Sequence, residues 1–92
     1  MKAKRNGTRN EHRTMALLEA AGYSCTRAAG SLGLFDVVGI GSADIVLVQV
    51  KTRDWPGLDE MERLKNFLCP PNCRRLIHRW RDRMRIPDVK EL

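Results

Sequence analysis

The apolar residues near the start of the chain recur at helical spacing. They predict a helix over residues 9–21. The stripe and its flank consist of Met15, Leu17, Leu18, Ala21 and Gly22. Glu11 falls on the same stripe, so its carboxylate is expected to face the core. Residues 1–8 are polar and basic and contain Gly7, which predicts a flexible basic tail.

The rest of the chain alternates between short apolar segments and turn residues, which is typical of strands. The segment 45–52 is apolar on both faces and is expected to lie at the centre of a sheet. Pro87 restricts the last segment to a sheet edge. Pro56, followed by two acids, predicts the first turn of a second helix that ends before Pro70. The predicted strands cover residues 23–27, 35–40, 45–52, 74–81 and 86–91. This order predicts one α/β domain over residues 9–92.

Length and charge narrow the class of protein. The 92 residues fit one domain with a core small enough to make dimerisation plausible. Seventeen Lys and Arg residues against eleven Asp and Glu residues give a net charge of +6, which favours a polyanionic partner such as nucleic acid. No apolar run approaches a membrane span and no signal-peptide core follows the basic start, so we expect a soluble, cytoplasmic protein. The three cysteines do not make a disulfide framework and are expected to be reduced.

A hairpin between segments 35–40 and 45–52 brings three polar side chains together. A loop of two or four residues gives the same register, in which Asp36 lies directly opposite Gln49. Lys51 shares their face because strand side chains alternate. A carboxylate and an amide oxygen so placed can ligate Mg²⁺, and a nearby ammonium can stabilise the charge that develops in phosphodiester hydrolysis. The pattern therefore predicts a metal-dependent site for phosphate chemistry.

An ordinary structural explanation of these three residues stays open. Asp36 and Lys51 would form an ion pair at a strand end, and Gln49 would be a buried amide with its hydrogen bonds satisfied. Ion pairs of this kind are common and say little about function. Glu11 shifts the balance toward a site, because a second acid facing the core is costly to bury without a cation or a donor.

Four short motifs, taken in order, resemble those of the PD-(D/E)XK nucleases. They are Glu11 on the opening helix, RAAGS at residues 27–31, FDVV at residues 35–38 and QVK at residues 49–51. Within that superfamily they are most similar to the archaeal-type Holliday junction resolvases, over residues 10–92. The resemblance implies a restriction-endonuclease-like αβββαββ core, in which two helices flank a mixed central sheet.

The resemblance also implies a role for each matching residue of the metal site. Asp36 would be the central metal-binding acid, Lys51 the lysine of the E-x-K element, and Glu11 the helix acid that joins the site. Val50 would add its backbone carbonyl as a ligand. Gln49 departs from the pattern, which more often has Glu; its amide keeps a ligand oxygen but lacks the charge, so metal binding should weaken unless Glu11 compensates. The implied cofactor is Mg²⁺, for which Mn²⁺ would substitute.

Basic and hydroxyl residues outside the metal site are candidate DNA contacts. The resemblance places Ser31 in a glycine-serine loop that lies beside the scissile phosphate, and Arg27 matches a basic position just before that loop. Near the end of the chain, arginines recur at every second position, which on an extended segment would line one side with positive charge. These arginines are Arg79, Arg81, Arg83 and Arg85. A charged edge strand that resists pairing with other chains explains the same pattern equally well.

Two further patterns favour ordinary structural roles. Cys69, Cys73 and His78 superficially suggest zinc, but their spacing is not that of a standard finger, and a Pro-Pro turn lies between the cysteines. Trp55 and Trp80 would suit stacking on an unpaired base. In so small a domain they are expected instead to anchor the core or a dimer.

These observations predict a Mg²⁺-dependent endonuclease that hydrolyses phosphodiester bonds in branched DNA, such as Holliday junctions, as a homodimer. Two alternatives stay open. One is a DNA-binding module of the same fold, catalytically weak or inactive because of Gln49. The other is a phage-encoded or restriction-like nuclease that acts on other DNA structures.

Overall fold

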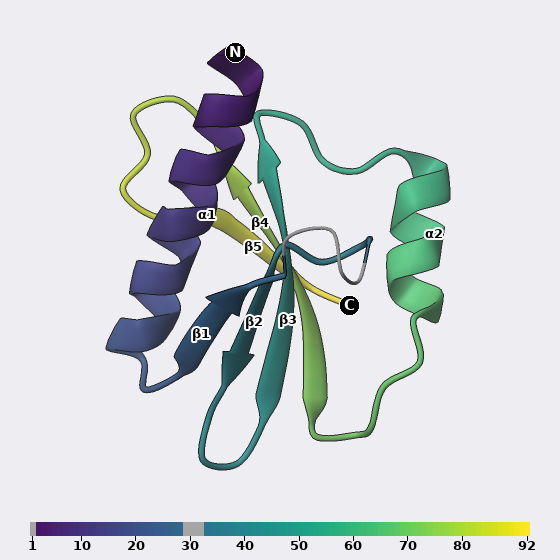
Figure 1. The fold of residues 1–92 in the computed structure, drawn as a ribbon. Helices are drawn as coiled ribbons and strands as arrows, with labels where there is room; N and C mark the ends of the chain where they lie inside the picture. The colour runs from purple at the N-terminus through teal and green to yellow at the C-terminus, as the bar shows by residue number, and fades with distance from the viewer. Residues whose placement is uncertain (1, 29–32) are drawn as a thin grey trace.

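The structure, a computed structural model, describes residues 2–28 and 33–92, and of residues 2–7 it describes the backbone alone. Within these ranges the chain forms two helices and five strands (Figure 1). Their bounds are α1 (Lys2–Ala20), β1 (Ser24–Arg27), β2 (Val37–Ile40), β3 (Ile45–Thr52), α2 (Leu58–Asn66), β4 (Cys73–Trp80) and β5 (Asp88–Glu91). The predicted order of helix, three strands, helix and two strands is confirmed.

The five strands form one mixed sheet in the order β1, β2, β3, β4, β5. β3 and β4 run parallel, and the other neighbouring pairs are antiparallel. β3 lies at the centre, as its apolar character on both faces predicts. β5 follows Pro87 and lies at an edge, where a missing backbone donor does little harm.

One helix covers each face of the sheet (Figure 1). Leu18 of α1 packs in a cluster with Val46 and Val48 of β3. On the other face, Leu64 of α2 packs in a cluster with Leu47 of the same strand. Successive residues of β3 therefore face opposite layers, because strand side chains alternate. This alternation decides which residues of β3 can meet each helix.

The first helix is longer than its apolar stripe predicts. It begins at Lys2, so residues 2–8 are helical and the predicted flexible tail is wrong for them. Lys, Ala and Arg are good helix formers, and one interior glycine, Gly7, costs only about 1 kcal/mol, so the helix extends beyond the residues that reach the core. At the other end the helix stops at Ala20, and Gly22 follows with φ 99°, as predicted for a closing glycine.

α2 joins the parallel strands β3 and β4, a connection that requires a crossover. Its N-cap is Gly57, so Pro56 precedes the helix and does not lie in the first turn as predicted. Because the chain turns directly from β3 into this crossover, the first turn of α2 lies near the end of β3. Glu60 of that turn thereby approaches Lys51.

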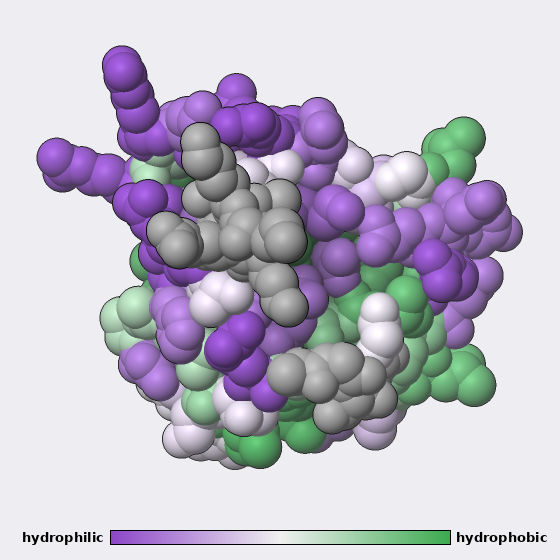
Figure 2. Space-filling model, turned by 45° about the horizontal axis from the view of Figure 1, so that its top comes forward, coloured by the Kyte–Doolittle hydropathy of each residue, from purple (hydrophilic) through white to green (hydrophobic). Residues whose placement is uncertain are grey.

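The surface is unevenly polar. Figure 2 shows hydrophilic residues across its upper left and apolar residues toward its lower right. Near the two ends of α2, Leu58 and Leu68 are 90% and 93% exposed. Neither helix of the described ranges has the apolar length needed to cross a membrane.

Candidate active site

Asp36 lies one residue before β2, beside the end of β3. Its Oδ2 accepts a hydrogen bond from the backbone amide of Val50 at 2.8 Å. The register of the hairpin is the predicted one, with Val37 paired to Val48, but the pairing stops there. The amide of Asp36 donates to the carbonyl of Val48 at 2.8 Å, so Asp36 is not the direct partner of Gln49 that the sequence predicts. A side-chain oxygen of the residue before β2, and not a backbone carbonyl, thus accepts the hydrogen bond of the Val50 amide.

The electrostatic surroundings of Asp36 are those of a crowded acidic site. Burial raises the pKa of its carboxyl above the ordinary value, and the negative charges of Glu11 and Glu60 raise this pKa further. The hydrogen bond from Val50 and the charge of Lys51 act in the opposite direction. Two neighbouring acids therefore act on the Asp36 carboxylate, and a bound cation would relieve this repulsion.

Gln49 and Lys51 both bind Glu60. From the sequence, this residue is predicted only to lie in the first turn of the second helix. Gln49 Nε2 donates to Glu60 Oε2 at 3.2 Å, and Lys51 Nζ lies 3.2 Å from Glu60 Oε1. The Gln49 side chain is nearly buried, with the residue 8% exposed. The signal that would have found Glu60 is the crossover, since the helix that follows a parallel strand begins beside the end of that strand.

Glu11 reaches the same region from α1. Its Oε1 lies 2.9 Å from Nε of Arg27, and the side chains of Glu11 and Arg27 are 20% and 36% exposed. The predicted position of Glu11 on the sheet-facing side of the helix is thus consistent with its partial burial and with its effect on the pKa of Asp36. Arg27, which matches the basic position just before the glycine-serine loop, thus forms an ion pair with this acid.

Ser31 and Val50 complete the set of predicted site residues. Ser31 lies outside the described residues. Val50 contributes its backbone amide to Asp36, while its carbonyl as a metal ligand stays a prediction.

The described residues contain no group of three or more His, Cys, Asp or Glu side chains arranged to hold a metal ion. Each of the three acids already has a partner. Asp36 accepts from the amide of Val50, Glu11 pairs with Arg27, and Glu60 pairs with Lys51. The chemistry of the donors nevertheless fits Mg²⁺, which prefers oxygen ligands and binds through one or two carboxylates while keeping several waters. The available donors are the carboxylates of Glu11, Asp36 and Glu60 and the amide oxygen of Gln49.

Cys69, Cys73 and His78 do not form one zinc site. Cys73 packs on the α2 side of the sheet, and Cys69 Sγ lies 3.4 Å from its carbonyl oxygen. His78 faces α1, where its Nδ1 lies 3.1 Å from the hydroxyl of Thr14. Burial lowers the pKa of His78 to about 4, and burial raises the pKa of Cys73 to about 11. These are the properties of packed groups.

The arginines near the end of the chain do not line one side of a strand, which corrects that prediction. β4 ends at Trp80, and Arg83 adopts φ 65° in the following loop, so the two-residue repeat does not survive as an extended segment. Arg79 is held 2.6 Å from Asp88 and stacks over Trp55, with 4.5 Å between the guanidinium carbon and the ring centroid. Trp80 is 1% exposed, which confirms the prediction of a core residue.

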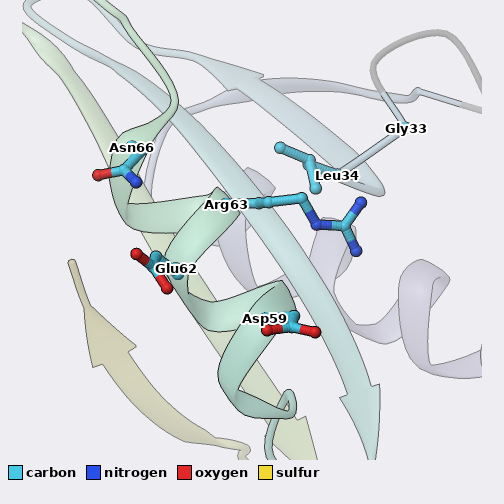
Figure 3. Close-up of a pocket in the computed structure, with 6 residues that line it drawn as sticks. All are labelled: Gly33, Leu34, Asp59, Glu62, Arg63 and Asn66. Atoms are coloured by element: carbon cyan, nitrogen blue, oxygen red, sulfur yellow. The ribbon is translucent and has the colours of Figure 1, made fainter.

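A separate cleft of about 840 Å³ lies beside α2. Its lining consists of Gly33, Leu34, Asp59, Glu62, Arg63 and Asn66. Figure 3 shows Arg63 reaching from α2 toward Leu34, with Glu62 and Asn66 on another side of the helix. None of these residues belongs to the site of Asp36 and Lys51.

The element order and the mixed sheet between two helices define a restriction-endonuclease-like α/β fold. The structure is similar to that of Archaeoglobus fulgidus Hjc, a Holliday junction resolvase from an archaeal hyperthermophile. The TM-score is 0.69, with 22% sequence identity, and the match covers 91% of this chain and 72% of that chain. No protein-family model and no curated protein matches the sequence. The resemblance that the motifs predict is therefore confirmed in the fold.

Proposed function

We propose that the protein is a metal-dependent endonuclease that hydrolyses phosphodiester bonds in branched DNA. The observation that supports this most is the convergence of Asp36, Gln49, Lys51 and Glu60 at one end of the sheet, with the Glu11 side chain close enough to affect Asp36. The convergence occurs in a fold similar to that of a Holliday junction resolvase. The net charge of +6 suits a polyanionic substrate.

The roles of the residues follow from their chemistry. Asp36 would hold a Mg²⁺ or Mn²⁺ ion together with Glu11 or Glu60 and the amide oxygen of Gln49. Bound there, such an ion supplies Lewis-acid chemistry, polarising the phosphodiester and lowering the pKa of the attacking water. Lys51 would stabilise the negative charge that develops on the phosphate, and Glu60 keeps its ammonium near the site until the phosphate arrives.

The remaining parts of the proposal concern substrate contacts and assembly. Ser31 and Arg27 would lie beside the scissile phosphate, with Arg27 moving from Glu11 to the phosphate. The active form would be a homodimer inside the cell, because a branched substrate offers two strands to two sites.

A second candidate function is a DNA-binding module of the same fold with weak or no catalysis. Two observations favour it. The Glu60 carboxylate accepts hydrogen bonds from both Gln49 and Lys51. In the part of the chain that the structure describes, no three or more His, Cys, Asp or Glu side chains are arranged to hold a metal ion. Calorimetry with Mn²⁺ separates the two functions: the endonuclease predicts binding at millimolar metal, and the module predicts DNA affinity without it.

The direct test is cleavage of labelled DNA. The full chain would be incubated with a four-way junction, a flap and a linear duplex, with and without Mg²⁺ or Mn²⁺. The expected result is metal-dependent cleavage of the junction that Asp36→Ala abolishes. Asp54→Asn is the matched control, since Asp54 is an exposed acid in the turn after β3 and leaves the site intact.

Three outcomes count against the proposal. Unchanged cleavage by Asp36→Ala would remove Asp36 from the mechanism. Junction binding without cleavage under any metal would support the DNA-binding module, and cleavage of linear duplex in preference to the junction would support a restriction-like substrate.

A further inference from the structure

A small basic cleft lies on the α1 side of the sheet, next to the candidate active site. It measures about 100 Å³, the volume of roughly three water molecules and thus the scale of one phosphoryl group. Four arginines line it, and they come from two distant segments of the chain: Arg9 and Arg13 from α1, Arg81 and Arg83 from the loop after β4. The only acid in the described lining is Asp82.

We call this cleft, lined by Arg9, Arg13, Arg81 and Arg83, the arginine pocket. Few acids neutralise its positive charge. Oδ2 of Asp82 lies 3.8 Å from Nη2 of Arg53, and Arg53 is not one of the residues that line the pocket. Arg81 is paired with Asp88 at 3.3 Å. No described acid forms an ion pair with Arg9, Arg13 or Arg83. A pocket that gathers cations without neutralising them favours an anion from outside.

Arg13 is held in place before any ligand arrives. Its guanidinium carbon lies 4.0 Å from the ring centroid of Trp80, and its Nη1 donates to Asn10 Oδ1 at 3.2 Å. Its Nη2 donates to the carbonyl of Met84. Asn10 is 6% exposed and is fixed in turn by a 2.8 Å bond to the hydroxyl of Thr52. A guanidinium fixed in this way loses little conformational entropy when it binds an anion.

The position of the pocket ties it to the active site. Thr52 lines the pocket, and Lys51, the residue before it, belongs to the candidate active site. Because consecutive strand residues point to opposite faces, the two sites lie on either side of the last residues of β3. A nucleic-acid strand that crosses this end of the sheet meets both.

We propose that the arginine pocket binds a backbone phosphate of the DNA substrate, at a different position from the phosphate that is cut. This inference rests on the proposed function, since it names a second contact with the same substrate. Arginine suits the role because its planar guanidinium donates two parallel hydrogen bonds to phosphate oxygens. The contact carries no base specificity, so it fixes where the strand lies on the protein.

The test compares two double variants of equal charge. Arg9→Gln with Arg83→Gln removes two exposed cations from the pocket, while Lys65→Gln with Lys90→Gln removes two exposed cations outside it. Binding of a fluorescent four-way junction would be measured over a series of NaCl concentrations. We expect the pocket variant to lose about tenfold in affinity and about one unit in the salt slope, as for one lost phosphate contact. The control should change much less.

Asp82→Asn supplies a second readout in the opposite direction. Asp82 is the single acid among the described lining residues, so removing its charge should tighten binding several-fold, whereas Asp54→Asn, an equal charge change outside the pocket, should not. If the pocket variant and its control behave alike and Asp82→Asn has no effect, the pocket is overturned while the proposed nuclease stands. If the unmodified chain fails to bind the junction at any salt, the proposed function and the pocket fall together.

Discussion

The carboxylate of Asp36 binds the backbone amide of Val50 at 2.8 Å, so the central acid of the candidate site also completes the hydrogen bonding of the central strand. One side chain thus has a structural and a chemical role. The two roles can be separated by substitution, because an amide keeps the hydrogen-bond acceptor and loses the charge.

Asp36→Asn and Asp36→Ala should differ in stability and agree in activity. Neither supplies an anionic ligand, so both should lose cleavage. Alanine leaves the amide of Val50 without its acceptor and should cost about 1–3 kcal/mol of unfolding free energy, whereas asparagine keeps an acceptor oxygen. Chemical denaturation of both variants measures the difference, and equal stability would show that the hydrogen bond contributes nothing.

Asp36→Asn also tests the raised pKa of Asp36. Because folding raises this pKa, the native state binds more protons than the unfolded state between the ordinary pKa, 3.8, and the raised value. Stability attributable to Asp36 therefore falls as the pH rises through that interval. Asp36→Asn removes the titration, so it should gain stability relative to the native chain above the interval and not below it. Thermal unfolding over a pH series checks the sign.

Gln49→Glu restores the acid that the nuclease pattern more often has. The new carboxylate would lie beside Glu60, which now accepts a hydrogen bond from Gln49 at 3.2 Å. Like charges should destabilise the metal-free protein by about 1 kcal/mol, while the affinity for Mn²⁺ should rise about tenfold. Thermal unfolding and calorimetry with Mn²⁺ measure the two effects. An unchanged metal affinity would place Gln49 outside the metal site.

His78 should make stability fall in mild acid. Burial lowers its pKa from 6.5 to about 4, so between these values the unfolded state takes up a proton that the native state does not. The unfolding free energy should therefore decrease as the pH falls from 6.5 toward 4, by at most about 1.4 kcal/mol per pH unit. His78→Gln should flatten this part of the profile. An identical slope in the variant would contradict the buried neutral imidazole.

Thr14 should be more sensitive to loss of its hydroxyl than to loss of its methyl group. It is fully buried, accepts a bond from the indole of Trp80 at 2.9 Å and contacts His78 at 3.1 Å. Thr14→Val leaves the indole donor unsatisfied, at a cost of about 1–3 kcal/mol. Thr14→Ser keeps the hydroxyl and should cost about 1 kcal/mol. The reverse order of stabilities would show that packing outweighs the hydrogen bonds here.

The parts of the fold that the sequence predicts are those set by side-chain periodicity. The bounds of β3 are the predicted 45–52, and the hairpin register is correct from Val37 onward, because one register alone keeps the apolar residues facing the helices. Periodicity does not predict the extension of α1 to Lys2, because residues with high helix propensity continue beyond the end of the apolar stripe.

The sequence predicts only those residues of the site whose positions follow from the periodicity of a single hairpin or helix. Asp36, Gln49 and Lys51 follow from strand alternation, and Glu11 from the helical stripe. Glu60 and the arginine pocket depend on where a crossover helix and a long loop fold back, which residue spacing within one element does not encode. The offset of Asp36 from Gln49 likewise depends on which acceptor, a side-chain oxygen or a backbone carbonyl, receives the hydrogen bond of the Val50 amide.

Lys51 and Thr52 are neighbours on the central strand of the sheet, so no loop separates the β3 residue of the candidate active site from that of the arginine pocket. One peptide unit joins the β3 residue of the candidate active site to the β3 residue of the pocket. In the proposed complex, a DNA strand that can bend over the end of the sheet would fill both sites at once, whereas a stiff straight duplex would fill only one. Selection by DNA shape would then come from the rigidity of β3, with no base read at all.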